Sequence, residues 1–264
     1  MKKFLVIGNP IEHSLSPKLH NFWMKKNNIN AFYEKKKILD GDLKDLIKKV
    51  QKGEISGINV TVPFKKKVID YLDKLSPGSK LTQSVNTICL DGKNLIGYNT
   101  DIDGFELAIK ELNFDVYNKK ILILGAGGVV PSIIFALNKL KSRQIIVSNR
   151  TKEKAENLKN LFKEIEITNW GDVPEFDMII NATSLGLKNN DKINLDLSKI
   201  NKGKFFYDII YNPKETNFLK EAKKFGNQIE NGRKMFIYQA AAAFELWHKI
   251  RPEIDENVKA LLND

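Results

Sequence analysis

The chain has 264 residues, of which 42% are hydrophobic, enough for one large globular domain or two small ones. Its net charge is +11, but the lysines are spread along the whole chain, which favours a solubilising role over a nucleic-acid-binding face. No apolar run approaches the ~18 residues of a membrane span, and the apolar stretch near the N-terminus is too short for a signal peptide. Cys89 is the only cysteine, which excludes an intrachain disulfide and agrees with a cytoplasmic protein.

The first hundred residues alternate short apolar runs with helical patterns, which predicts a mixed or parallel sheet with helices on its faces. The expected strands are 3–7, 31–33, 58–62, 87–90 and 95–98, the last two flanking the hairpin signal Asp91-Gly92. The expected helices are 17–26, 43–51 and 66–74. Ser16 is positioned to cap the first of these helices, with Pro17 in its first turn.

The second half of the chain shows a βαβ series, the pattern of a nucleotide-binding domain. A helix over 104–112 is expected to join it to the first half. The expected strands are 121–124, 144–148, 177–181 and 205–210, with a helix from the glycine turn after the first strand to about 141. A last long helix is expected over about 234–250.

The segment 59–65, Asn-Val-Thr-Val-Pro-Phe-Lys, is the most informative part of the first half. A strand here puts Asn59 and Thr61 on one face, opposite two valines, and the proline ends the pairing. Lys65 then stands at a helix N-terminus, where the backbone dipole disfavours positive charge and favours proton loss, which suits acid–base chemistry. The alternative is an edge strand followed by a solvated, lysine-rich turn.

A glycine turn in the second half is a candidate phosphate cradle. Gly125, Gly127 and Gly128 follow an apolar strand and precede a helix, so their backbone could approach a pyrophosphate at the helix N-terminus. The third small position of this fingerprint holds Val130 instead, followed by Pro131. Valine at that position is expected to push the helix away from the strand.

The end of the next strand favours NADP over NAD. An NAD site needs an acid about 20 residues past the glycines to hold the ribose hydroxyls. The sequence has Asn149-Arg150-Thr151 there, with Lys154 nearby and no carboxylate at the strand end. Arginine and hydroxyl donors suit a 2′-phosphate. The alternative is that Arg150 is a solvated loop residue.

These pieces form an ordered set of motifs that resembles the shikimate dehydrogenase family over nearly the whole chain. The motifs are 8–17 (GNPIEHSLSP), 59–65 (NVTVPFK), 84–87 (SVNT), 97–101 (GYNTD), 181–184 (NATS), 207–213 (YDIIYNP) and 232–239 (GxxMxxxQ). The resemblance implies reversible, NADPH-dependent reduction of 3-dehydroshikimate to shikimate, a step toward aromatic amino acids. From the residues themselves we expect no metal, nucleic-acid or membrane partner, and the sequence leaves open whether the protein is a monomer or a homodimer.

The resemblance also implies an α/β fold of two domains with the active site in the cleft between them. The first is an α/β substrate domain with a mixed sheet, residues 1–102, completed by the C-terminal helix at about 236–264. The second is a Rossmann-like NADP-binding domain, residues 103–235.

Carried over residue by residue, the resemblance makes Lys65 and Asp101 the catalytic pair. Lysine would exchange the proton at the substrate oxygen, and the carboxylate would orient it while raising its pKa, against the helix effect. The implied substrate-binding residues are Ser14, Ser16, Asn59, Thr61, Asn86, Tyr211 and Gln239. The implied cofactor-binding residues are Gly125, Ala126, Gly127, Gly128, Val129, Asn149, Arg150, Thr151, Lys154, Thr183, Ile209, Gly232 and Met235.

Three departures from the family pattern lie on the cofactor side. They are Val-Val-Pro at 129–131, Lys154 in place of an arginine, and Arg233-Lys234 where the family often has Leu-Gly. We therefore expect weaker NADPH binding than in a typical member, and a dissociation constant in the low micromolar range would contradict this. The alternatives are a quinate/shikimate dehydrogenase using NAD, and a non-catalytic nucleotide- or nucleic-acid-binding protein on the same fold.

Overall fold

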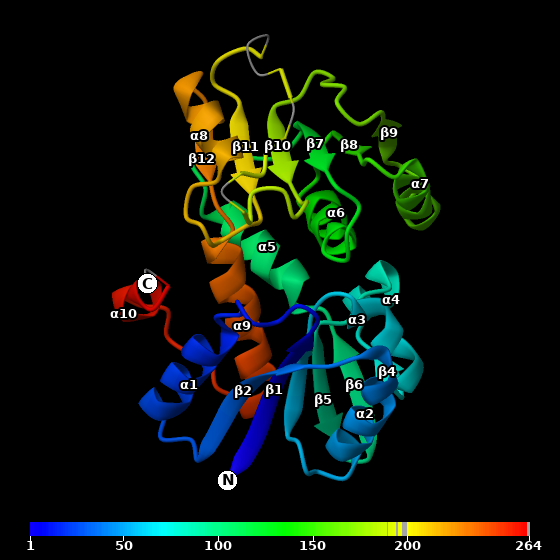
Figure 1. The fold of residues 1–264 in the computed structure, drawn as a ribbon, viewed down its shortest axis with the longest axis vertical. Helices are drawn as coiled ribbons and strands as arrows, with labels where there is room; N and C mark the ends of the chain where they lie inside the picture. Colours follow the sequence, from blue (N-terminus) through cyan, green and yellow to red (C-terminus); the bar gives the residue numbers. More distant parts are fainter. Residues whose placement is uncertain (189, 194, 197–199, 263–264) are drawn as a thin grey trace. The chain divides into compact units, whose positions relative to one another are not determined.

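The computed structural model describes residues 1–188, 190–193, 195–196 and 200–262, and the chain divides into two compact units. The first comprises Met1–Gly104 and Ile237–Asp264, and the second Phe105–Phe236. Each unit contains one six-stranded sheet with helices packed on it (Figure 1), so the predicted α/β class is confirmed. Among the described residues, no helix is both long and apolar enough to cross a membrane.

The sheet of the first unit is mixed, as predicted, with the strand order β2-β1-β3-β5-β6-β4. Its strands are β1 (Lys2–Gly8), β2 (Ala31–Lys37), β3 (Gly57–Val60), β4 (Lys74–Leu75), β5 (Thr87–Asp91) and β6 (Asn94–Tyr98). Strand β1 is parallel to β2 and β3, whereas β5 is antiparallel to β3 and β6. The α-helices that lie wholly in this unit are α1 (Ser16–Lys26), α2 (Leu43–Gln51), α3 (Phe64–Lys67), α4 (Pro77–Thr82) and α10 (Glu256–Ala260).

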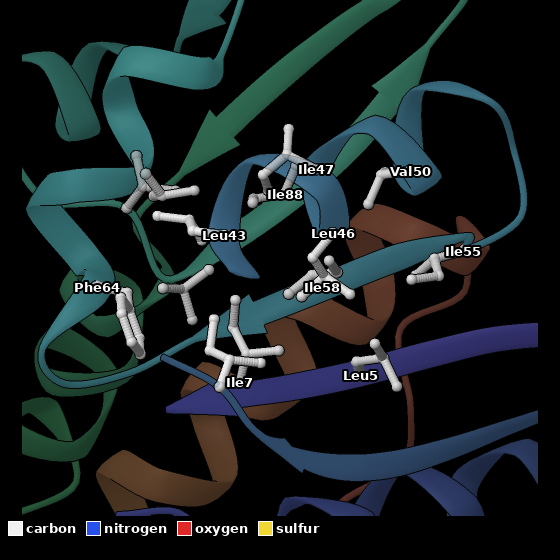
Figure 2. Packing of buried hydrophobic residues seen from close by; sticks show 14 of the residues in the cluster. Leu5, Ile7, Leu43, Leu46, Ile47, Val50, Ile55, Ile58, Phe64 and Ile88 are labelled. Atoms are coloured by element: carbon white, nitrogen blue, oxygen red, sulfur yellow. The ribbon is translucent and has the colours of Figure 1, made fainter. Parts of the chain in front are cut away.

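One face of this sheet packs on α2 through an apolar core (Figure 2). Helix α2 buries residues at the spacing i, i+3, i+4 and i+7, which gives it one continuous apolar stripe. The residues of that stripe are Leu43, Leu46, Ile47 and Val50. They meet alternate residues of the strands, among them Leu5, Ile7, Ile58 and Ile88. Asn59, the polar residue of β3, therefore belongs to the opposite face.

Helix α9 (Arg233–His248) runs from the second unit into the first, and its C-terminal part packs on the first sheet. The indole of Trp247 donates a hydrogen bond to the carbonyl of Ile88 at 3.0 Å. A Cβ at Gly57 would overlap that indole, so the absence of a side chain in β3 permits this close approach.

The second unit is an all-parallel, doubly wound sheet, as expected for a Rossmann-like domain. Its strands are β7 (Lys120–Leu124), β8 (Gln144–Ser148), β9 (Glu166–Thr168), β10 (Met178–Asn181), β11 (Phe205–Asp208) and β12 (Gln228–Glu230). Their order is β12-β11-β10-β7-β8-β9, so the direction of winding reverses between β7 and β10. The helices are α6 (Val130–Lys139), α7 (Lys152–Leu161), α8 (Asn217–Lys224) and most of α5 (Thr100–Lys110).

The predicted helix over 66–74 is wrong. Helix α3 ends at Lys67, a 3₁₀ turn follows over Val68–Tyr71, and Leu72 is extended. The backbone N–H of Asp73 donates to the carbonyl of Leu95, and its carboxylate accepts from the Leu95 N–H at 2.7 Å. This pairing draws the chain into the sheet as β4, so a long-range contact overrides the local helical pattern.

Other predicted boundaries are also wrong: β2 runs to Lys37 rather than 33, and β11 ends at Asp208 rather than 210. Ser16 does not cap α1 but is its first residue, and no side chain caps that end. Strand β3 ends at Val60, so Thr61 and Val62 lie outside it. Helix α5 begins at Thr100 rather than at 104, because the side-chain oxygen of Asn86 accepts from the Thr100 N–H at 2.8 Å. The elements β4, β9, β12, α4, α7, α8 and α10 and the 3₁₀ turns were not predicted.

Candidate functional site

The strand pairing of the first sheet gathers polar residues at one edge. Because β3 is antiparallel to β5, and β5 to β6, the end of β3, the start of β5 and the end of β6 coincide. In that register Thr87 pairs with Asn59 on one side and with Tyr98 on the other. Residues that follow β3, precede β5 or follow β6 therefore meet at this edge.

Lys65, from α3, and Asp101, from the first turn of α5, form an ion pair at this edge. The Lys65 Nζ lies 2.5 Å from Asp101 Oδ2, and the two side chains are only 12% and 8% exposed. The other carboxylate oxygen, Oδ1, accepts a hydrogen bond from Asn86 Nδ2 at 2.9 Å. The Lys65 carbonyl accepts from the Val85 N–H at 2.9 Å, which fixes the backbone of the lysine. The predicted catalytic pair thus forms, with both carboxylate oxygens engaged.

Asn86 connects Asp101 to the rest of the edge. Its Oδ1 accepts from the N–H and the hydroxyl of Thr100, at 2.8 Å and 3.1 Å, and from the Thr87 hydroxyl at 3.0 Å. The residue is 3% exposed. Asn86 therefore holds the start of α5 as well as the carboxylate.

Asn59 is hydrogen-bonded to Asn86 and uses most of its own bonding capacity within the fold. Its Nδ2 donates to the carbonyl of Asn86 at 3.1 Å and to the hydroxyl of Thr87 at 2.9 Å. Its Oδ1 accepts from the hydroxyl of Tyr33 at 2.7 Å. Both amide hydrogens are used within the fold, so one lone pair of Oδ1 is what remains for another molecule.

Ser14, Ser16 and Thr61 lie at the same edge, because β1 is parallel to β3 and both end there. The Thr61 N–H donates to the carbonyl of Ile7 at 2.9 Å, and the Ser14 Oγ accepts from the Ser16 N–H at 3.4 Å. Ser14 and Thr61 are half-buried and Ser16 is buried. Burial raises the pKa of Tyr33 well above its usual value, and the nearby Ser16 side chain opposes this shift.

The two other predicted substrate residues lie elsewhere in the chain. Gln239 is half-buried on the part of α9 that belongs to the first unit. Tyr211 belongs to the second unit, where its ring stacks on that of Phe236 with centroids 4.3 Å apart. The first unit by itself therefore links Lys65, Asp101, Asn86 and Asn59 by hydrogen bonds, and Ser14, Ser16 and Thr61 lie at the same sheet edge.

The glycine turn of the second unit has the backbone of a phosphate cradle. Gly125 directly follows β7 with φ +112°, and a Cβ there would lie 2.8 Å from the carbonyl oxygen of Ala182. Gly127 and Gly128 are exposed ahead of α6, and Ala126 and Val129 are half-buried. These groups fit a pyrophosphate bound at the N-terminus of α6.

Val130 is fully buried in the first turn of α6, and Pro131 follows it there without interrupting the helix.

The residues predicted to hold the 2′-phosphate follow β8, the strand beside β7. The Gly125 N–H donates to the carbonyl of Ser148, the last residue of β8, at 2.7 Å, which ties the two loops together. Arg150, Thr151 and Lys154 are exposed there, and Asn149 Nδ2 donates to the carbonyl of Thr151 at 2.7 Å. Exposed cationic and hydroxyl groups of this kind suit a phosphate.

The residues predicted near the nicotinamide follow β10 and β11. The Ile209 N–H donates to the carbonyl of Asn181 at 3.0 Å, and the Gly232 N–H donates to the carbonyl of Ile210 at 3.1 Å. A Cβ at Gly232 would overlap the carbonyl of Ile209, so these two predicted residues are in direct contact. Thr183 is half-buried at the end of β10, and Met235 is buried in α9.

Asp208 holds these loops together and was not predicted as a site residue, although the motif 207–213 contains it. Its Oδ1 accepts from Asn181 Nδ2 and the Ile210 N–H, and its Oδ2 accepts from the Thr216 hydroxyl at 2.6 Å. The residue is fully buried. Burial raises the pKa of this carboxyl from 3.8 to about 6, against the opposing effect of its hydrogen bonds.

Three family models match the chain in order. They are "Shikimate dehydrogenase substrate binding domain" over residues 6–88, "Shikimate / quinate 5-dehydrogenase" over 106–217, and "Shikimate 5'-dehydrogenase C-terminal domain" over 232–262. A shikimate dehydrogenase (NADP(+)) of Pelagibacter ubique is 58% identical over 262 residues, covering 99% of each chain.

Solved structures agree with these matches. A crystal structure of a shikimate dehydrogenase in complex with NADP+ has a TM-score of 0.93 at 37% identity, covering 100% of this chain and 95% of that one. The Thermus thermophilus shikimate 5-dehydrogenase in complex with NADP(H) and shikimate has a TM-score of 0.90 at 30% identity, covering 100% and 99%.

Asp208 is expected to make the stability of the second unit depend on pH. Because its folded-state pKa lies above its ordinary value, its stabilising contribution is present below about pH 4 and is lost as pH rises through about 6. The isosteric Asp208→Asn variant carries no ionisable group. Relative to the wild type, it should gain about 3 kcal/mol of unfolding free energy between about pH 4 and pH 7.

Urea unfolding of both proteins across that pH range measures the difference between their unfolding free energies. The contributions of other titrating groups cancel in this difference. Asp172→Asn, at an exposed aspartate of the same unit, is the control and should follow the wild type. A difference between Asp208→Asn and wild type that stays constant with pH would contradict the assignment.

Proposed function

The chain belongs to the shikimate dehydrogenase family, and on that premise we propose that it reduces 3-dehydroshikimate to shikimate reversibly with NADPH. The observation that carries this proposal is the Lys65–Asp101 ion pair at a sheet edge lined with neutral polar groups. A small hydroxylated acid needs many placed donors and acceptors rather than an apolar pocket. A site of this kind rejects analogues that lack a hydroxyl, because its own buried polar groups are then unpaired.

Reduction of the ketone requires a hydride at the carbonyl carbon and a proton at the oxygen. NADPH, which the turn at 125–129 and the residues after β8 would hold, would supply the hydride and be left as NADP+. Lys65 donates the proton to the oxygen and takes it back in the reverse direction, recovering its own proton from solvent. Asp101 holds the lysine nitrogen in place at 2.5 Å, and Asn86 holds Asp101.

Substrate recognition is proposed to divide among hydroxyl and amide groups. Ser14 and Ser16 would hold the carboxylate, and Thr61 would contact the carboxylate or a ring hydroxyl. Asn59 and Asn86 already form several hydrogen bonds within the protein. They would contact the substrate only through donors and acceptors that these bonds leave unused. Tyr211 and Gln239 complete the proposed set.

Cofactor binding is proposed for the second unit. The turn at 125–129 would hold the pyrophosphate, and Asn149, Arg150, Thr151 and Lys154 would hold the adenosine ribose and its 2′-phosphate. Thr183, Ile209, Gly232 and Met235 would contact the nicotinamide. Lys154 offers a point charge where an arginine would offer a planar fork, which supports the proposal of weaker NADPH binding.

We further propose a role in aromatic amino acid synthesis and a cytoplasmic location. A single, buried cysteine suits a reducing compartment.

The assay that tests this function follows NADPH absorbance after mixing the protein with 3-dehydroshikimate. We expect rapid loss with NADPH and slower loss with NADH. Faster oxidation of NADH would favour the NAD-dependent quinate/shikimate alternative. No oxidation of either cofactor, together with salt-sensitive binding to DNA or RNA, would favour the non-catalytic alternative.

Replacing Lys65 with alanine should remove turnover while leaving shikimate binding almost unchanged. A proton donor that acts in the transition state contributes about 10²–10⁴-fold to kcat. The shikimate dissociation constant from titration calorimetry should stay within a few-fold of wild type.

Lys66→Ala changes the exposed neighbouring lysine and is the matched control, expected to keep wild-type kinetics. A parallel loss of rate and affinity in Lys65→Ala would make Lys65 a binding residue instead.

A further inference from the structure

We propose that Tyr33 is a positioning residue for the catalytic pair, acting through Asn59 and Asn86 on Asp101. This inference rests on the function proposed above. Tyr33 lies in β2, two strands away from β3, and none of the motifs in the sequence contains it. Its hydroxyl nevertheless reaches Asn59 at 2.7 Å.

Two residues of α1, Asn21 and His20, hold the Tyr33 backbone and ring in place. Asn21 of α1 donates to the Tyr33 carbonyl at 2.8 Å and accepts from the Tyr33 N–H at 2.9 Å. The ring stacks on that of His20, with centroids 4.3 Å apart and planes within 2°. Burial lowers the pKa of His20 to about 3, so the stacking partner is neutral at physiological pH. A ring held in this way directs its hydroxyl at one acceptor.

The direction of the hydrogen bonds follows from their chemistry. The carbonyl of Asn86 can only accept, so the amide nitrogen of Asn59 must face it. The amide oxygen of Asn59 therefore faces Tyr33, and the tyrosine must donate.

From Asn59 the hydrogen bonds run without interruption to the ion pair. Asn59 donates to the Asn86 carbonyl and to Thr87, Thr87 donates to Asn86 Oδ1, and Asn86 donates to Asp101. Tyr33, Asn59, Asn86 and Thr87 are all less than 9% exposed, so water cannot readily replace a missing partner. Removal of the Tyr33 hydroxyl leaves the Asn59 oxygen without a donor and loosens the amides that hold Asp101.

The Tyr33→Phe variant tests this inference, because it removes one oxygen and keeps the stacked ring. We expect kcat for shikimate oxidation to fall about 5–30-fold, as one lost buried hydrogen bond would allow. The shikimate dissociation constant should change less than about threefold. Tyr71→Phe, at a tyrosine that is 38% exposed in the same unit, should match the wild type.

A second measurement separates positioning from other roles. In the Asp101→Asn background, Tyr33→Phe should reduce the residual rate by less than about twofold, because its effect passes through Asp101. An undiminished effect there would overturn the inference. So would a loss of shikimate affinity at constant kcat, which would assign Tyr33 to substrate binding. A lowered unfolding midpoint at constant kcat would also overturn it.

The side-chain amide resonances of Asn59 and Asn86 test the same hydrogen bonds without turnover. Both should shift in Tyr33→Phe and neither in Tyr71→Phe. An unchanged Asn86 resonance would overturn the inference. If the wild type is inactive but the amide resonances shift as expected, the proposed function is refuted. The hydrogen bonds from Tyr33 to Asp101 would still be supported.

Discussion

Lys65 and Asp101 carry opposite charges 2.5 Å apart, with only about one-tenth of each side chain exposed. Taking two charges out of water costs several kcal/mol per ion, and their attraction compensates only when the geometry is good and the remaining polar atoms are bonded. Here Asn86 engages the second carboxylate oxygen, and Thr87 and Thr100 engage Asn86. The surrounding amides and hydroxyls therefore maintain a pair that would be costly by itself.

The mixed sheet makes this arrangement possible. In the first unit β1, β2 and β3 run in parallel, and the β5–β6 hairpin pairs antiparallel to β3. The hairpin brings Asn86 and Asp101 to the edge where β3 leads into Lys65. An all-parallel sheet would place the start of β5 at the opposite edge. The second unit is all-parallel, and its loops gather instead at the ends of β7, β8, β10 and β11.

Elements with a strong local pattern were predictable from the sequence. Helix α2 and strand β8 have the bounds expected from apolar periodicity and composition. The helix over 66–74 was wrong because Asp73 pairs with Leu95, 22 residues away. The start of α5 was misplaced because its cap comes from Asn86, which no local pattern reveals.

The site residues were likewise predictable where a local motif marks them and not where a long-range contact defines their role. Lys65 and Asp101 belong to motifs that can be recognised in the sequence, and the structure brings them together. Tyr33 belongs to none of these motifs, and the motif that contains Asp208 does not reveal its role, because both roles arise from contacts across strands and between loops. A tyrosine in a strand is ordinarily a packed aromatic residue, and only the position of Asn59 gives its hydroxyl a partner in the site.

A double-mutant cycle on Lys65 and Asp101 tests the central claim most directly. The kcat of shikimate oxidation is measured for Lys65→Ala, Asp101→Asn and the double variant. If the two residues act as one unit, the double variant should lose about as much activity as the more damaging single variant. Losses that multiply would show that the two residues act independently, and would contradict the account.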